Sequence, residues 1–274
     1  MDTTSRRNFI PGRDNKEINP GPETKPAPKY RNMKTNKEHV LSFSSLKAFS
    51  RSPNHFLNYK AGDRIESPAM KLGTAAHCAV LEPDRWKEDY LLCTERKGTK
   101  AYKAILETNP KAILLNKSDY DSAKKIRSSL QEEPAARKLI EDATQIETMV
   151  YGNIKGLPFR GIVDAATKQY ICDLKTTRDA SPREFQRAAY NNSYHVQAAI
   201  YCELTGIEDY WIIAAENNAP YNVVPYKIDK YYLKLGRETL YDWIDRFKAW
   251  DGAPEGYNPN KERCLLLTPP AWAK

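Results

Sequence analysis

The sequence lacks the features that mark several large classes of protein. It has no run of about 18 uninterrupted apolar residues, the length that a membrane-spanning helix needs, and its first residues lack the apolar stretch of a secretory signal. Its five cysteines are scattered and contain no Cys-x-x-Cys pair, so neither a disulfide framework nor a zinc site is indicated. We therefore expect a cytoplasmic protein with no membrane partner and with reduced, mostly buried thiols.

The composition predicts a folded, basic protein. Of the 274 residues, 41% are hydrophobic, and 17 are tyrosines and 5 are tryptophans, which is enough for one substantial core. Lys and Arg total 43 against 35 for Asp and Glu, and the net charge of +8 favours a phosphate-rich partner such as nucleic acid. Net charge attracts such a partner, but a site has to come from local chemistry.

Proline and charge divide the chain into three parts. Residues 1–40 are rich in Pro, Lys and Arg and have no apolar periodicity, which predicts a flexible basic arm. Residues 41–250 contain helical and extended patterns in succession and predict one main domain. Residues 251–274 are again rich in Pro and predict an irregular tail.

The middle part predicts helices around a mixed sheet. Helices are expected, with a break at Pro53 in the first of them, over residues 44–56, 70–81, 99–107, 118–130, 181–190, 194–204 and 231–250. Strands are expected over residues 112–116, 145–151, 157–166, 170–177, 210–215 and 222–228. Helices, then a β-meander, then helix, strand and helix are typical of an α/β or α+β fold whose central mixed sheet is flanked by helices.

One hairpin of the meander gathers two carboxylates and an ammonium group. Because side chains alternate along a strand, Asp173 and Lys175 point to one face of the sheet. If residues 168–169 form a two-residue turn, Asp164 lies directly across from Asp173. Like charges in opposite positions are destabilising, so this pairing indicates a divalent cation between the carboxylates.

The tripeptide acidic-x-Lys is not specific by itself, because it occurs four times in the chain. Only Asp173-Leu-Lys175 falls in a β pattern and has another strand-borne acid, Asp164, nine residues upstream. Glu147, in the preceding strand, could reach the same acidic cluster and support a second metal or a water. The alternative is a solvated hairpin edge whose charges only keep the protein soluble.

Together with three further segments, these residues resemble a known superfamily. With His77 and Gln197-Ala-Ala-Ile-Tyr201 in place, the chain resembles the PD-(D/E)XK nucleases, and within them the phage RecE-like exonucleases of the exonuclease VIII type. Supporting segments, in consistent order, are Leu41-Ser-Phe-Ser-Ser-Leu with Arg51-Ser52-Pro53, Leu72-Gly73-Thr-Ala-Ala-His77, and Glu147 before Gly161-Ile-Val-Asp164. The resemblance spans about residues 40–250.

The resemblance implies a restriction-endonuclease-like core with a metal site. Asp164, Asp173 and the Leu174 carbonyl would bind Mg²⁺ or Mn²⁺, Glu147 is a candidate for a second metal, and Lys175 would lie beside the attacked phosphate. Related nucleases with an iron–sulfur cluster have three cysteines clustered late in the chain. Only one of the cysteines here lies late, so no iron–sulfur cluster is expected.

The resemblance also implies a biological setting. The substrate would be the ends of linear double-stranded DNA, digested from the 5′ end to leave 3′ single-stranded tails for recombination. The protein would form a ring-shaped homo-oligomer with a single-strand annealing protein of the RecT type as partner. It would be phage- or prophage-encoded and would act in the cytoplasm of the bacterial host cell.

Five further residues have two open interpretations each. His77, in an Ala-rich helix, is either a hydrogen-bonded core residue or, as in related nucleases, a neighbour of the metal. Gln197 and Tyr201, one helical turn apart, either act at the site and contact DNA or pack their helix on the sheet. Arg51 and Ser52 either bind the 5′-terminal phosphate of DNA or form a helix-breaking surface turn.

Three functional hypotheses follow. The leading one is a Mg²⁺-dependent exodeoxyribonuclease acting on linear duplex DNA. The second is an endonuclease or flap nuclease with the same site and different access for the substrate. The third is a catalytically silent DNA-binding or assembly protein, and the intact set Asp164, Asp173 and Lys175 argues against it.

Overall fold

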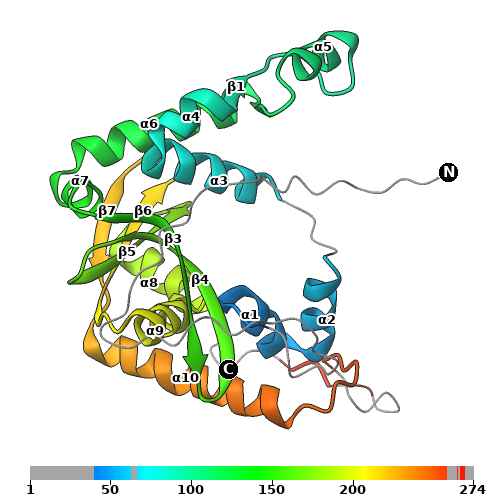
Figure 1. The fold of residues 1–274 in the computed structure, drawn as a ribbon, viewed down its shortest axis with the longest axis vertical. Helices are drawn as coiled ribbons and strands as arrows, with labels where there is room; N and C mark the ends of the chain where they lie inside the picture. The colour runs from blue at the N-terminus through cyan, green and yellow to red at the C-terminus, as the bar shows by residue number, and fades with distance from the viewer. Residues whose placement is uncertain (1–39, 63–66, 258–263, 265, 269–274) are drawn as a thin grey trace.

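The computed structural model describes residues 40–62, 67–257, 264 and 266–268. These residues form helices on both faces of a five-stranded mixed sheet (Figure 1). The arm expected over residues 1–40 lies, except for its last residue, outside the described residues, as does much of the tail expected over residues 251–274. None of the helices in the described ranges is long and apolar enough to span a bilayer.

The helices of the described part are α1 (Phe43–Arg51), α2 (Pro53–Ala61), α3 (Pro68–Leu81), α4 (Pro83–Asp89), α5 (Lys100–Thr108), α6 (Lys117–Glu132), α7 (Pro134–Glu141), α8 (Pro182–Asn191), α9 (Tyr194–Thr205) and α10 (Lys230–Ala249). The strands are β1 (Tyr90–Leu92), β2 (Ile113–Leu115), β3 (Gln145–Ile154), β4 (Leu157–Ala166), β5 (Tyr170–Thr177), β6 (Asp209–Glu216) and β7 (Val223–Lys227). The predicted helices around a mixed sheet are confirmed.

The large sheet has the order β3-β4-β5-β6-β7 and contains the expected meander. Pairing is antiparallel throughout except between β5 and β6, which are parallel because α8 and α9 connect them. The β3–β4 turn places Lys155 at φ 47 and Gly156 at φ 81, the left-handed pair that a tight two-residue hairpin turn requires. The two-residue turn expected at residues 168–169 is confirmed, since the Thr167 N–H donates to the Tyr170 carbonyl at 2.9 Å.

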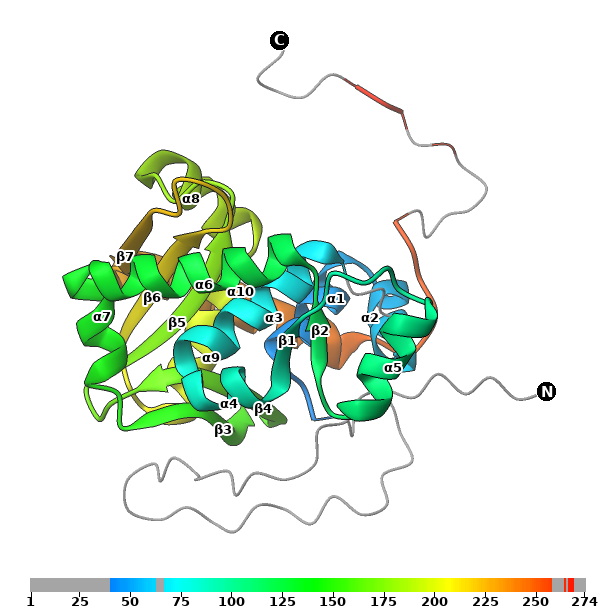
Figure 2. The same ribbon diagram turned by 90° about the horizontal axis from the view of Figure 1, so that it is seen from above.

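Two apolar cores lie on opposite faces of this sheet. Helices α1, α8, α9 and α10 cover one face, which we call the α9 face, and α3, α6 and α7 cover the other, the α3 face. Strand β6 shows the division, because Ile212 and Ala214 belong to the first core, whereas Ile213 and Ala215 belong to the second. Figure 2 shows α3 and α6 lying in front of the sheet with α10 behind it.

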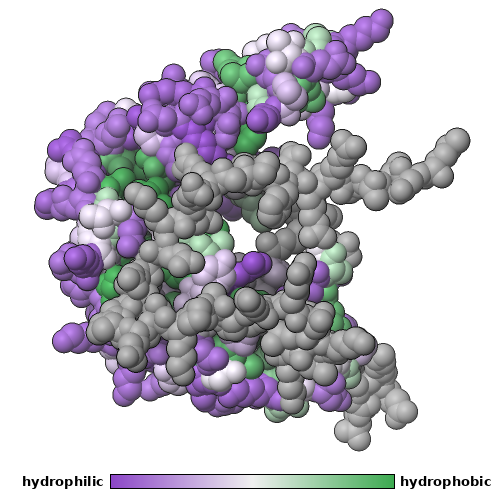
Figure 3. Space-filling model, viewed as in Figure 1, coloured by the Kyte–Doolittle hydropathy of each residue, from purple (hydrophilic) through white to green (hydrophobic). Residues whose placement is uncertain are grey.

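A third, smaller core joins α3, α4 and α6 to the parallel pair β1 and β2. Trp86 stacks on Tyr90 there, with ring centroids 4.6 Å apart. From this core a projection extends that ends in α5, a helix without a buried residue. Figure 3 shows hydrophobic residues on this projection and hydrophilic residues over the outer surfaces of α6 and α10.

The structure corrects several expectations about element boundaries. Helices α4 and α7 and strand β1 were not expected, because each is short and the two helices start at a proline directly after another helix. Helix α1 begins at Phe43, one residue before the expected start, because Ser42 caps it. Helix α6 begins at Lys117, one residue before the expected start, because Asn116 caps it. Helix α8 begins at Pro182, one residue after the expected start.

Candidate active site

The two strands β3 and β4 kink where each of them has an acidic residue. Glu147 and Asp164 lie at the same level of the hairpin, with regular backbone pairs on either side. Glu147 has a φ of 47, a value that residues with a Cβ adopt rarely. Val163 packs into the core on the α9 face, whereas Ala165, two residues later, packs on the α3 face. Because a regular strand would put both on one face, side-chain alternation breaks at Asp164.

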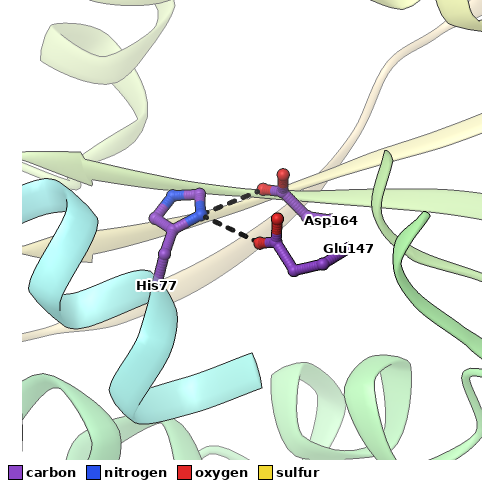
Figure 4. A group of neighbouring side chains, drawn as sticks. All are labelled: His77, Glu147 and Asp164. Carbon is purple, nitrogen blue, oxygen red and sulfur yellow. Dashed lines mark ion pairs between the residues drawn. The ribbon is translucent and has the colours of Figure 1, made fainter. Parts of the chain in front are cut away.

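His77, from α3, points at both of these acids (Figure 4). Its Nδ1 atom lies 3.5 Å from Asp164 Oδ2 and 3.9 Å from Glu147 Oε1. One ligand atom from each of the three residues can be chosen so that all lie within 4.8 Å of one another. One imidazole nitrogen and two carboxylate oxygens are donors that suit a divalent cation such as Mn²⁺ or Mg²⁺.

The charges of this cluster shift the pKa values of its members. Burial favours the neutral imidazole of His77, but the carboxylates of Asp164 and Glu147 outweigh burial and raise the pKa of His77 to about 9. Burial also raises the pKa of Asp164, and the positive charges of His77 and Lys175 oppose that effect only in part. A cation in this cluster would therefore replace a proton as the positive charge between the acids.

Asp164 lies in the expected register but is used differently from the expectation. The β4–β5 backbone pairs are Ala165 with Cys172 and Ala166 with Ile171. In this register the next pair would be Asp164 with Asp173, but the backbone pairing ends before it. Instead, Asp164 Oδ2 accepts a hydrogen bond of 2.8 Å from the backbone N–H of Leu174. Where the two strands separate, this carboxylate thus accepts a hydrogen bond from β5 in place of a backbone carbonyl of β4. Whether the Leu174 carbonyl is a metal ligand stays a prediction.

Asp173 has different partners on the α9 face. Its side chain is almost wholly buried, at 1% exposure, and Lys175 Nζ lies 2.6 Å from its Oδ2 atom, as a close ion pair without the direction of a good hydrogen bond. Gln197 Nε2 donates to the other oxygen, Oδ1, at 3.0 Å. Burial raises the pKa of Asp173 to about 6 although the Lys175 charge opposes it. Burial alone would lower the pKa of Lys175, but Asp173 and Asp164 raise it, so Lys175 is a cation at neutral pH.

Helix α9 brings Gln197 and Tyr201 to the site on one face, as expected from their spacing. Gln197 Nε2 lies 3.4 Å from the Tyr201 hydroxyl, and both side chains are buried. The Tyr201 ring packs directly on Gly161 of β4, where a Cβ atom would collide with the ring. Gln197 thus contacts a site carboxylate while Tyr201 packs the helix on the sheet, and the contact of this pair with DNA stays a prediction.

Arg51 and Ser52 lie at the junction of α1 and α2. Ser52 is buried and caps α2 by accepting a hydrogen bond from the His55 N–H, so its hydroxyl already has a structural task. The exposed Arg51 side chain donates to the Tyr257 hydroxyl at 3.4 Å. The proposed contact of these two residues with a DNA phosphate stays a prediction.

Sequence reasoning missed two residues near Lys175. Its Nζ atom lies 5.1 Å from the ring centroid of Tyr194, at the start of α9. Burial and the charges of Lys175 and Arg51 lower the pKa of Lys47, whose Nζ donates to the Asn192 carbonyl at 2.7 Å. Lys47 and Arg51 are four residues apart on α1, so they lie on one face of the helix. This spacing in the sequence could have predicted a basic stripe beside the site.

Sheet and site together define the class of this protein. A mixed sheet with buried acids on neighbouring strands and a lysine two residues after the second acid is a PDDEXK-like domain, which places the chain among the hydrolytic nucleases. A family model described as "PDDEXK-like domain of unknown function" matches residues 42–256. The chain belongs to this family, and the predicted resemblance to the PD-(D/E)XK superfamily is confirmed.

A solved structure shares this fold. A protein from Eubacterium rectale, provisionally described as an exonuclease, is 15% identical, with a TM-score of 0.58 over 88% of this chain and 97% of that chain. A phage-related exonuclease from Haemophilus somnus 129PT is 12% identical over 64% of this chain and 92% of its own, but the TM-score of 0.34 supports no argument. Among curated proteins, none matches this chain.

Proposed function

We propose that this protein is a divalent-metal-dependent exodeoxyribonuclease that degrades linear double-stranded DNA. The observation that supports it is the meeting of His77, Glu147 and Asp164 with the ion pair of Asp173 and Lys175. Membership of a PDDEXK-like family supports the same reading. Residues 41–250 are the proposed nuclease domain.

The residues that would hold the cation are Asp164, Glu147 and His77, with Asp173 beside them. A bound divalent cation would neutralise charge on the phosphate oxygens and lower the pKa of an attacking water. The chain itself contributes an imidazole nitrogen and carboxylate oxygens. A cation would balance the negative charge of the carboxylates, since the pKa values of the buried Asp164 and Asp173 are raised without one.

Lys175 is the proposed residue for the charge that develops on the phosphate. It is positively charged at neutral pH, and its ammonium group is held between Asp173 and the ring of Tyr194. A fixed ammonium group stabilises a transition state better than a mobile one, because no free energy is needed to orient it during the reaction. Gln197 would be a positioning residue, since it holds the other oxygen of Asp173.

The finer parts of the proposal rest on the sequence resemblance. They are digestion from the 5′ end, 3′ single-stranded products for recombination, a ring-shaped homo-oligomer, a RecT-type annealing partner, and action of a phage- or prophage-encoded protein in the bacterial cytoplasm. The basic pair Lys47 and Arg51 on α1 favours an anionic strand next to Lys175, which agrees with a DNA substrate.

The test is digestion of linear duplex DNA labelled at either the 5′ or the 3′ ends, with a closed circle alongside. We expect early release of the 5′ label with Mg²⁺ or Mn²⁺, none with EDTA, and none from Asp173→Asn. The control Asp245→Asn changes an exposed acid that pairs with Lys155 and should stay active. Cutting of the closed circle would indicate an endonuclease, and intact DNA in every reaction would leave a DNA-binding protein.

A further inference from the structure

An aromatic groove lies on the α9 face, between α8, β7 and the start of α10. Its volume is about 400 Å³. Rings from three elements line it, namely Phe185 and Tyr190 from α8, Tyr226 from β7, and Tyr231 and Tyr232 from α10. A groove with several flat apolar walls favours a flat apolar ligand.

The rings around the groove are already arranged in stacks. Tyr190 lies parallel to His195, with centroids 5.4 Å apart and an angle of 3°, and His195 stacks on Tyr232 at 4.9 Å and 22°. Tyr190 covers His195 with one face of its ring, yet 59% of Tyr190 is exposed. The other face of Tyr190 is therefore open, and one more flat ring placed there would extend the stack.

Polar atoms near the groove lack partners. Within the described ranges, His195 Nδ1 and the Tyr232 hydroxyl are buried and have no hydrogen-bond partner. Buried polar atoms without a partner are unfavourable, and most proteins avoid them. Both atoms are covered in this structure, so the stack of rings itself is what favours a flat ligand such as a nucleobase.

Side-chain contacts link the wall of the groove to the candidate active site. Lys175 Nζ lies over the ring of Tyr194, and the Tyr194 ring in turn lies 6.3 Å from that of Phe185, which lines the groove. Phe185 is stacked on Tyr226 with centroids 5.0 Å apart. Two ring contacts thus connect the lysine proposed for the phosphate to the wall of the groove.

We propose that this groove holds an unpaired base of the DNA strand being cut, at a nucleotide close to the scissile phosphate. The inference rests on the proposed function, because it takes DNA as the substrate. A base inside a duplex has both faces covered by its neighbours, so an internal base has to be unpaired and unstacked before it can stack on Tyr190. Stacking accepts every base, which suits an enzyme that moves along DNA of any sequence.

The test compares binding of two fluorescently labelled single-stranded oligonucleotides in EDTA, by anisotropy. One is oligo-dT, and the other has the same backbone with abasic sites. We expect wild type to bind oligo-dT more tightly, and Tyr190→Ala to bind it on the order of tenfold more weakly with no change for the abasic strand. Tyr190→Phe keeps the ring and should bind like wild type.

Two further variants make the test specific. Tyr231→Ala changes a side chain that is 77% exposed at the groove, so this variant should fold even if Tyr190→Ala does not, and it should also weaken binding of oligo-dT. Tyr151→Ala removes a tyrosine that is 47% exposed on β3 and should bind like wild type. Equal binding of both oligonucleotides by wild type, Tyr190→Ala and Tyr231→Ala would overturn the inference.

A parallel digestion of linear duplex DNA separates the two proposals. If wild type digests DNA but its preference for oligo-dT survives both groove substitutions, the groove inference fails and the nuclease stands. If wild type digests no DNA and yet loses that preference with Tyr190→Ala, the nuclease fails and the groove stands as a site for unpaired bases.

Discussion

Asp164 and Asp173 are buried aspartates on neighbouring strands, and they have opposite kinds of partner. Asp164 lies with an imidazole and a second carboxylate on the side of α3, whereas Asp173 lies with an ammonium group and an amide on the side of α9. The first set holds a positive charge only while a proton stays on His77, and the second contains its own in Lys175. We therefore propose that the layer that faces each aspartate decides its main task, metal binding for Asp164 and support of the Lys175 charge for Asp173.

Replacing Asp164 should have the largest effect. In Asp164→Asn the side chain keeps an acceptor for the Leu174 N–H, so the fold should survive, but one charge of the cation site is lost. We expect Mn²⁺ binding by calorimetry to disappear and the rate of DNA digestion to fall on the order of a thousandfold. Metal binding at wild-type affinity in this variant would contradict the assignment of Asp164.

Lys175→Met should separate the two sets of partners. This variant should still bind Mn²⁺, because the His77 cluster is untouched, but digestion should fall on the order of a hundredfold. The charge of Asp173 is then buried without its ion-pair partner, and the free energy of unfolding should fall by roughly 3 kcal/mol. The double variant Asp173→Asn/Lys175→Met should recover stability in urea without recovering activity, and recovered activity would contradict the role of the lysine.

A matched pair of glycine substitutions tests the two layers. A Cβ atom at Gly236 in α10 would collide with the backbone carbonyl of His195 in α9, so Gly236→Ala should lower the free energy of unfolding by about 2 kcal/mol. At Gly73 in α3 the nearest atom is Thr176 Oγ1 at 3.4 Å, and Gly73→Ala should be neutral or stabilising by up to about 1 kcal/mol. Urea unfolding measures the change in the free energy of unfolding for both variants. Equal changes would show that α9 shifts without cost to make room for the added Cβ atom.

The smallest effect expected is a pH dependence of metal affinity. The pKa of His77 is about 9 in the metal-free protein, so below that pH a proton on His77 opposes a cation beside Asp164. Affinity for Mn²⁺ should rise with pH by at most about tenfold per unit and level off near pH 9. His77→Gln should abolish the part of this slope that is due to His77, and an unchanged slope would show that another group titrates.

Local patterns explain which parts of the fold were predictable. The meander, the turn at residues 168–169 and the common face of Asp173 and Lys175 depend on neighbours in the sequence. Helices α4 and α7 were missed because helices of this length depend on tertiary packing, as the buried Trp86 of α4 shows.

The assembly of the site was less predictable than its members. The regular alternation of side chains in the sequence gave no sign of the kink at Glu147 and Asp164. The φ of Glu147 and the face on which the side chains next to Asp164 pack depend on the strands around them. Tyr194 was not assigned to the site, because its contact with Lys175 arises only when α9 folds back over β5.

The sequence by itself determined the longer helices and the strands of the large sheet, the hairpin with its two aspartates and lysine, and the superfamily resemblance, because all of these depend on residue order and periodicity. Only the tertiary structure decided that His77 and Glu147 meet Asp164 while Lys175 and Gln197 meet Asp173. These contacts join residues far apart in the chain, and they form because apolar packing fixes α3 and α9 on opposite faces of one sheet.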